Sequence, residues 1–259
     1  MEVTIIGSGN VATVLGRLLL QSGHHIIEVY SRNNDHAAEL AKQLGAGAVS
    51  DLTMLNAGAD LYLLAVTDDA LAGVAKELSL KDKLVVHTAG SVSKEILKTV
   101  SSNYGVLWPM KMIRKNMPAL SPVTIVIDGS SETVLAQIER LAREFSPVVT
   151  KADDLLRTKM HMLAAITSNF TNHLYHLAAE YCEQENIDIN FFFPLIEETA
   201  QRIQSNHPKL VQAGPAFRGD MQTLEKHRLL LEKYPQIQKV YREMSESIGL
   251  SFGKVNCEW

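Results

Sequence analysis

The sequence has little cysteine: its two cysteines, Cys182 and Cys257, stand far apart and fit neither a metal-ligand spacing nor a disulfide framework. We therefore expect no metal site and a protein that works in the reducing cytoplasm. The first expected strand begins almost at Met1, which leaves no room for a signal or transit peptide. This pattern also favours a cytoplasmic protein.

The sequence has no segment in which charges of one sign are concentrated. The chain carries 25 Lys and Arg against 29 Asp and Glu, a net charge of −4, without long runs of like charge. A nucleic-acid backbone calls for a clustered basic face, so the charge pattern argues against nucleic acid as the main partner, and we expect none. No repeat or low-complexity segment occurs, and 259 residues with 46% hydrophobic side chains suit one large or two ordinary domains.

The sequence does contain a glycine-rich turn between an apolar run, residues 3–6, and an amphipathic helical pattern, residues 14–20. Gly7 permits a tight turn, Gly9 lets the backbone approach phosphate oxygens, and the small Ala12 lets the helix lie close to the strand. This G-x-G-x-x-A pattern is typical of a helix N-terminus that binds a dinucleotide pyrophosphate, although any tight strand-to-helix turn can have the same sequence. The candidate cofactor-binding residues are Gly7, Ser8, Gly9, Asn10 and Val11.

A second strand, residues 25–30, completes a βαβ unit of the expected length. Sites for NAD usually place an acid after this strand, whereas an Arg there suits the 2′-phosphate of NADP. Here Ser31 and Arg32 occupy that position, and the nearest acid, Asp35, is expected to cap a helix over residues 37–44. We therefore predict NADP, bound by Arg32 with Ser31 as a supporting donor; the alternative is a solvated arginine in a surface turn.

Further strands alternate with helical segments, which predicts an α/β fold with a doubly wound parallel sheet. They are expected at residues 48–49, 60–66, 83–87, 104–108, 123–128 and 147–149. Ligands of such sheets bind outside the carboxyl ends of the strands, and ordinary polar capping is the alternative for polar residues there. The candidates at this edge are Thr67, Asp68, Thr88, Ala89 and Lys111.

From residue 151 onward the pattern becomes helical, so we place a domain boundary between a cofactor-binding domain, residues 1–150, and an α-helical domain, residues 151–259. Residues 160–179 contain no Asp, Glu, Lys or Arg. Their three histidines and two asparagines make a membrane span a poor reading, so we expect a helix buried on nearly every side and no membrane partner.

On a helical wheel this helix has one apolar face and one polar, uncharged stripe. The apolar face comprises Leu163, Ile166, Phe170, Leu174, Leu177 and Tyr181. The stripe comprises His161, Ala165, Ser168, Asn172 and His176, with Asn169 at its flank. A solvated face would carry charges, so the stripe is expected to face a cleft, a ligand or another subunit. We predict that His161, Ser168 and Asn169 contact a substrate; a satisfied structural histidine is the alternative for His161.

A second group of candidate residues lies just before a helix that begins near residue 220 and within that helix. Gly214 and Pro215 indicate a turn, Asp220 is a plausible N-cap, and His227 returns to the same helical face. Together Arg218, Asp220 and His227 would bind a carboxylate or carbonyl substrate. The alternative is an internal Arg218–Asp220 ion pair that fixes the turn.

Several motifs resemble bacterial Rossmann-like proteins with a helical C-terminal domain of unassigned function, related to pyrroline-5-carboxylate, ketopantoate and deazaflavin-dependent NADP reductases. The motifs are residues 7–12, 65–70, 161–170, 194–196 and 214–220, with His227. The resemblance implies an NADP-binding Rossmann domain, to whose site it adds Ala65 and Val66. It also implies a helical domain that forms a homodimer, and a cleft between the domains for a small-molecule substrate.

The leading hypothesis is an NADP-dependent oxidoreductase that reduces a small carbonyl or imine compound. The nicotinamide would lie near Thr67, Thr88 and Ala89, and His161 would supply the proton. Ser168 and Asn169 would orient the substrate, and the residues around Arg218 would close the site. The alternatives are a non-catalytic NADP sensor acting through a partner, and a helical half that serves chiefly for dimerisation.

Overall fold

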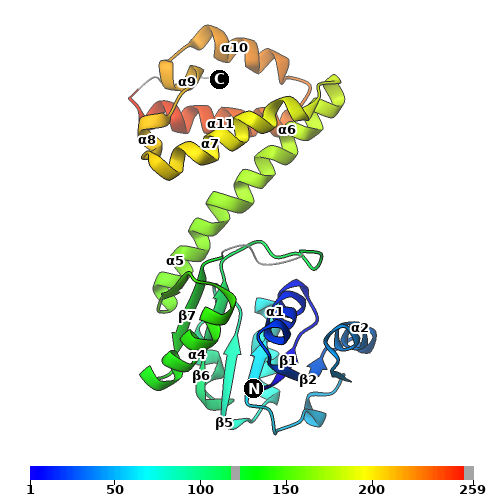
Figure 1. The fold of residues 1–259 in the computed structure, drawn as a ribbon. Coiled ribbons are helices and arrows are strands. Elements are labelled where there is room, and N and C mark those ends of the chain that lie inside the picture. Colours follow the sequence, from blue (N-terminus) through cyan, green and yellow to red (C-terminus); the bar gives the residue numbers. More distant parts are fainter. Residues whose placement is uncertain (118–122, 254–259) are drawn as a thin grey trace. The chain divides into compact units, whose positions relative to one another are not determined.

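The computed structural model describes residues 1–117 and 123–253 (Figure 1). The chain forms two compact units, Met1–Asn169 and Phe170–Trp259. Cys257 lies outside the described residues, while Cys182 is a buried free thiol. In the part of the chain that is described, none of the helices is both long and apolar enough to cross a membrane.

The first unit is built on one sheet of eight strands in the order β3-β2-β1-β4-β5-β6-β7-β8. The strands are β1 Glu2–Ile6, β2 His25–Tyr30, β3 Gly47–Val49, β4 Leu61–Leu64, β5 Lys81–His87, β6 Ser101–Pro109, β7 Ile125–Gly129 and β8 Val149–Lys151. Strand β1 lies between β2 and β4, so the chain winds outward in both directions from it, as the doubly wound fold requires.

The expectation of an all-parallel sheet is wrong at one pair. Strand β7 runs antiparallel to β6, with Gly105 opposite Gly129, and β8 is then parallel to β7. A parallel partner would need a crossover connection, usually a helix, but the described part of the segment between β6 and β7 contains no helix. Every pair of neighbouring strands among β1 to β6 is parallel.

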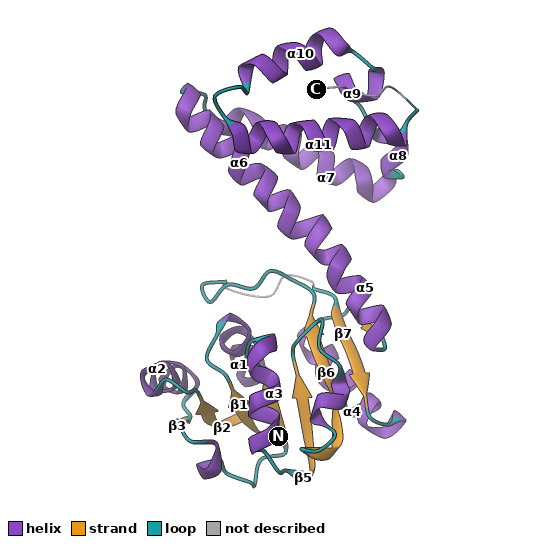
Figure 2. Ribbon diagram, turned by 180° about the vertical axis from the view of Figure 1, so that it is seen from behind, coloured by secondary structure: helices purple, strands orange, loops and turns teal. Residues whose placement is uncertain are grey.

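Helices cover both faces of the sheet (Figures 1 and 2). One face packs against α1 Asn10–Gln21, α2 Asn34–Leu44 and α4 Glu132–Phe145 in a single apolar core. The other face packs against α3 Asp68–Glu77 and the short helices η1 Leu52–Met54 and η2 Lys94–Leu97. Burial on both faces explains why strands such as β4 are continuous apolar runs.

The cap expected for α2 is wrong by two residues. Asn33, not Asp35, is the N-cap, and its side chain accepts a hydrogen bond from the His36 backbone N–H at 3.1 Å. The helix begins at Asn34, so Asp35 falls in its first turn, where a carboxylate still interacts favourably with the helix dipole.

After β8 the chain is helical, as the sequence predicts. The elements are α5 Asp154–Ala164, the π-helical η3 Ala165–Phe170, α6 Thr171–Glu185, η4 Ile189–Phe192, α7 Phe193–Ser205, α8 Pro208–Val211, α9 Pro215–Arg218, α10 Met221–Leu230 and α11 Pro235–Ser251. The change from strands to helices falls at residues 151–154, whereas the two compact units meet at residues 169 and 170. Helix α5 therefore belongs to the sheet-containing unit, and a functional domain boundary near residue 150 stays a prediction.

The uncharged segment over residues 160–179 differs from expectation in two ways. It is not one regular α-helix, because the π-helical η3 interrupts it. It is also not buried within this chain: Leu163 is 52% exposed and Phe170 60%, although Leu177 is buried. Its missing charges therefore do not reflect coverage by this chain's own core.

Candidate functional site

All the residues predicted to bind a cofactor line one cavity of about 510 Å³ at the carboxyl ends of the strands. They are Gly7, Ser8, Gly9, Asn10, Val11, Ser31, Arg32, Ala65, Val66, Thr67, Thr88 and Ala89. Tyr30, Gly90, Trp108 and Ile113 also line it, although the sequence does not indicate them as cofactor-binding residues. The carboxyl ends of β1, β2, β4 and β5 meet at this edge because those strands are parallel neighbours.

The glycine-rich turn forms the floor of this cavity. Gly7 has a φ of +125°, and a Cβ there would lie 2.2 Å from the Ala65 carbonyl oxygen, so only glycine fits. Gly9 is the N-cap of α1, and no side chain caps that helix end. A Cβ on Gly9 would meet no atom within 4 Å, so the first turn of α1 opens onto free space. Uncapped N–H groups at such a helix end favour an anion.

At the end of β2, Ser31 and Arg32 border the same cavity. The Ser8 hydroxyl donates a hydrogen bond to Ser31 Oγ at 3.0 Å, which joins the glycine-rich turn to this strand end. Arg32 is exposed, so its guanidinium can turn toward a ligand in the cavity. An arginine guanidinium in this position can bind a phosphate through two parallel hydrogen bonds.

The segment after β5 is held in place by a buried histidine. Ala89 N–H donates to His87 Nδ1 at 3.2 Å, and Thr88 N–H donates to the Leu64 carbonyl at 3.1 Å. Burial, reinforced by the nearby positive charge of Arg157, lowers the pKa of His87 to about 4. His87 is therefore neutral at physiological pH and accepts the Ala89 hydrogen bond.

His161 forms part of the wall between this cavity and a second one of about 580 Å³. Its ring centroid lies 5.6 Å from that of Trp108. A Cβ on Gly90 would lie 2.6 Å from His161 Cδ2, which shows how closely the histidine approaches the segment after β5. Trp108 likewise borders both cavities.

The second cavity brings together three of the predicted substrate residues, His161, Ser168 and Asn169. Its remaining lining is mostly apolar and comes from the end of β6 and from α5 and η3: Trp108, Met110, Lys111, Met112, Met160, Leu163, Ala164, Ala165 and Thr167. The sequence places Trp108 and its successors at the carboxyl edge of the sheet, but not opposite α5, because that depends on how α5 docks.

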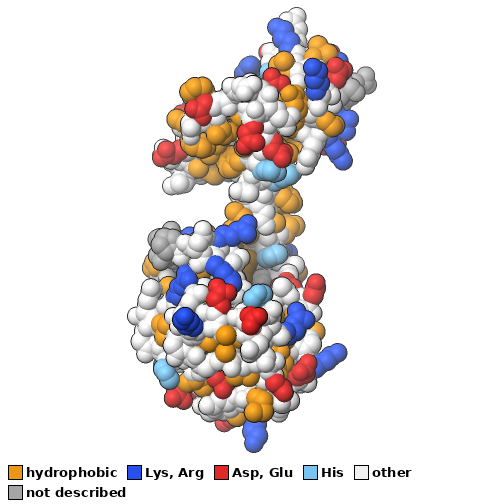
Figure 3. Space-filling model, turned by 90° about the vertical axis from the view of Figure 1, so that its right-hand side faces the viewer, with side chains coloured by type: hydrophobic (Ala, Val, Ile, Leu, Met, Phe, Trp, Pro, Cys, Tyr) orange, Lys and Arg blue, Asp and Glu red, His pale blue; other side chains and the backbone are white. Residues whose placement is uncertain are grey.

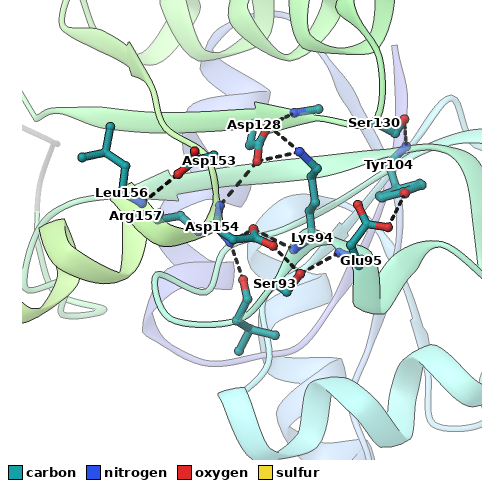
Figure 4. A network of polar contacts seen from close by, with 12 residues as sticks. Ser93, Lys94, Glu95, Tyr104, Asp128, Ser130, Asp153, Asp154, Leu156 and Arg157 are labelled. Atoms are coloured by element: carbon teal, nitrogen blue, oxygen red, sulfur yellow. Dashed lines mark hydrogen bonds and ion pairs between the residues drawn. The ribbon is translucent and has the colours of Figure 1, made fainter.

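A buried charged network anchors α5 (Figure 4). Arg157 is 1% exposed and donates through Nη2 to Asp154 Oδ1 at 2.6 Å and to the Val92 carbonyl at 2.5 Å. Asp154 also accepts hydrogen bonds from the Ser93 hydroxyl and the Lys94 backbone N–H. Burial raises the pKa of Asp154, but these hydrogen bonds outweigh it, and the net pKa is lowered.

The same network continues to the sheet. Lys94 Nζ lies 2.9 Å from both carboxylate oxygens of Asp128, a residue of β7. Arg157 Nη1 lies 3.8 Å from Asp128 Oδ2. Because His161 is one helical turn beyond Arg157, the network fixes the turn that carries His161. The sequence gives no sign of this cluster, since charged residues are usually exposed.

The other predicted substrate residues lie in the second unit. Asp220 is the N-cap of α10, as expected, and accepts from Thr223 N–H at 3.1 Å and Thr223 Oγ1 at 2.8 Å. These hydrogen bonds lower its pKa. His227 Nδ1 lies 2.6 Å from the Tyr241 hydroxyl, and Arg218 ends α9. A role for Arg218, Asp220 and His227 in binding substrate stays a prediction.

Comparison with known proteins places this architecture in a family. Residues 2–91 match the family of coenzyme F420-dependent NADP oxidoreductases, and residues 123–248 match a domain of unknown function, DUF2520. A Bacteroides fragilis protein provisionally named an NADP oxidoreductase is 35% identical to this chain. The match covers 96% of this chain and 97% of that protein, and the two structures superimpose with a TM-score of 0.89. The chain belongs to this family of NADP oxidoreductases. The expected family and Rossmann-type fold are confirmed.

More distant members of the fold include two reductases. The 1-pyrroline-5-carboxylate reductase of Streptococcus pyogenes is 15% identical, with a TM-score of 0.68 over 96% of this chain and 98% of its own. An imine reductase of Myxococcus stipitatus, solved with NADP⁺, is 15% identical, with a TM-score of 0.64 over 97% of this chain and 93% of its own. At these identities the likeness concerns the fold.

One curated relative matches this chain over a shorter region. Glycerol-3-phosphate dehydrogenase [NAD(P)+] of Staphylococcus aureus is 28% identical over 116 residues, which is 39% of this chain. The matched region spans 35% of that enzyme, so the chain covers about a third of its length. The comparisons give no support to a non-catalytic sensor.

Proposed function

We propose that this NADP oxidoreductase reduces a small carbonyl or imine compound with NADPH. One observation carries the proposal: His161 borders both the cavity at the glycine-rich turn and the mostly apolar cavity beside it. A side chain in that position can hold a proton between a cofactor and a second molecule. The histidine is exposed, so its proton can be replaced from solvent.

The residues of the first cavity fit NADP. The bare helix end at Gly9 and the open space beside it suit a pyrophosphate, which Gly7, Ser8, Asn10 and Val11 would also contact. Arg32 and Ser31 would hold the 2′-phosphate. The rest of the cofactor would lie along the ends of β4 and β5, against Ala65, Val66, Thr67, Thr88 and Ala89.

A bound NADPH would supply the hydride that reduces the carbon of the C=O or C=N bond. The imidazolium of His161 donates its proton to the substrate oxygen or nitrogen, which yields the alcohol or amine. Ser168 and Asn169 orient the substrate by hydrogen bonds in the second cavity. The packing of His161 against Trp108 keeps the imidazole in this position.

The experiment is a kinetic comparison of His161→Ala with His173→Ala, a variant of an exposed histidine on α6. NADPH oxidation is followed with a panel of cyclic imines and 2-oxo acids, and NADPH affinity is measured by calorimetry. We expect His161→Ala to lower kcat by about 10²- to 10⁴-fold with NADPH affinity retained, and His173→Ala to behave as the unmodified protein. Tight NADPH binding without turnover of any panel member would refute the proposal.

We further propose that the protein is a homodimer through the helical unit. Large apolar side chains are exposed on η4 and α7, among them Phe191 at 75%, Phe193 at 53% and Leu195 at 60%. Hydrophobic side chains also gather on this unit in Figure 3. Monomeric proteins rarely expose large contiguous apolar patches, and a second copy of the chain would cover this one.

Sedimentation tests the dimer. Leu195→Glu places a charge in the apolar patch, whereas Leu229→Glu changes a similarly exposed leucine, 52% accessible, on α10. We expect the unmodified protein and Leu229→Glu to sediment as dimers and Leu195→Glu to shift toward monomer. A monomeric unmodified protein would overturn the proposal.

We propose a cytoplasmic location for this activity. The support is the reduced Cys182, together with a reaction that draws on NADPH. Cell fractionation with detection of the chain tests it, and recovery outside the cytoplasmic fraction would contradict it.

A further inference from the structure

The second cavity has an uneven distribution of charge. Among the described residues that line it, Lys111 is the one Lys, Arg, Asp or Glu. The other lining side chains are apolar or neutral, apart from the titratable His161. Lys111 is half-buried, and it is the charged side chain that borders this mostly apolar cavity.

The ammonium of Lys111 has no carboxylate within ion-pair distance among the described residues. Lys94, in contrast, is paired with both oxygens of Asp128. A cation beside an apolar wall, without a counter-charge of its own, is stabilised when an anion binds next to it. Lys111 therefore supplies the cavity with an anion-binding group that no carboxylate of the described residues neutralises.

The backbone holds Lys111 close to the sheet. Its N–H donates to the Pro109 carbonyl at 2.9 Å, directly after β6, and Met110 N–H donates to the Thr124 carbonyl at 2.9 Å. Farther along, the Lys115 N–H donates to Asn10 Oδ1 at 3.2 Å, which ties the segment to the start of α1. The charge is thus placed at the same edge of the sheet as the cofactor cavity.

We propose that the substrate is a monoanionic carboxylate with an apolar body. Its carboxylate binds Lys111, and its body lies against Met110, Met112 and Met160, whose flexible side chains adapt to different shapes. The inference rests on the proposed function, since it names the substrate class of that same site. A phosphate ester is disfavoured because a dianion calls for several donors, such as an Arg fork or a helix N-terminus.

The experiment uses ligands that share one body and differ in charge. Benzoate, benzamide and phenyl phosphate, and separately cyclohexanecarboxylate and its carboxamide, are titrated by calorimetry into the full chain saturated with NADP⁺. The proteins are the unmodified chain, Lys111→Met, Lys111→Arg and the control Arg114→Met, which changes an exposed cation of the same segment that lines neither cavity.

We expect each acid to bind about 10- to 100-fold more tightly than its amide, as a charge-assisted hydrogen bond provides. Lys111→Met should abolish the difference, Lys111→Arg should keep part of it, and Arg114→Met should leave it unchanged. Equal affinity for acid and amide, no binding of the acids, or tighter binding of phenyl phosphate than of benzoate would overturn the inference.

Cofactor titration separates this inference from the proposed function. If NADP⁺ does not bind the unmodified protein, the proposed function fails. If NADP⁺ binds and the ligands show no dependence on charge, the substrate class alone is refuted.

Discussion

The imidazole of His161 and the indole of Trp108 lie with their centroids 5.6 Å apart and their planes tilted by 52°. Both rings close over Gly90: a Cβ added there would lie 2.6 Å from His161 Cδ2 and 2.7 Å from Trp108 Cε2. Because Gly90 has no side chain, His161, the proposed proton donor, can lie this close to the segment after β5.

Gly90→Ala should therefore displace His161. Small displacements of a reacting group can cost about 10²-fold in rate, so we expect a fall in kcat of about that size. Gly73→Ala is the matched control, because a Cβ on this glycine in α3 meets no atom within 4 Å. Steady-state kinetics of the two variants check the prediction, and an unchanged kcat for Gly90→Ala would count against it.

Arg157 should be important for stability. Arg157→Met removes a buried cation and leaves Asp154 and Asp128 with fewer partners, so the free energy of unfolding should fall by about 3–5 kcal/mol. Arg143→Met removes an exposed pair with Glu139, at 54% side-chain exposure for the arginine, and should cost less than about 1 kcal/mol. Urea denaturation measures both, and equal losses would contradict the assigned role of the network.

Buried His87 should make the folded protein sensitive to acid. Its pKa is about 4 in the folded state against the usual 6.5, so between these values the unfolded state binds more protons. Stability therefore falls as the pH drops from about 6.5 toward 4, by about 2 kcal/mol between pH 7 and pH 5 from this group.

His87→Gln should remove that contribution and flatten the acid side of the stability profile. Urea denaturation of both proteins at pH 7 and pH 5 gives the comparison. An equal loss of stability on acidification in the variant would show that other groups cause it.

The sequence predicts which residues come together in the first cavity, because its parts follow local rules. The turn at Gly7, the cation at Arg32 and the polar residues after β4 and β5 each follow a strand, and parallel neighbours bring those ends together. The antiparallel direction of β7 is not predicted, because it depends on the connection after β6 and not on the residues of β7 itself.

The second cavity could be predicted only in part. The sequence indicates His161, Ser168 and Asn169 because they are polar residues in an uncharged segment. The position of Lys111 across the cavity from α5 and the burial of Arg157 depend on tertiary docking, which leaves no local pattern. The exposure of Leu163 and Phe170 cannot be predicted from the sequence, because a lack of charge does not show what covers a helix.

The central claim, an NADP site built on the glycine-rich turn and Arg32, is tested most directly by calorimetric titration with NADPH and NADH. We predict that the unmodified protein binds NADPH more tightly by about tenfold or more, as a charge-assisted phosphate contact provides. Arg32→Ala should abolish this preference while Arg143→Ala keeps it. Comparable affinities for NADPH and NADH in the unmodified protein would contradict the account.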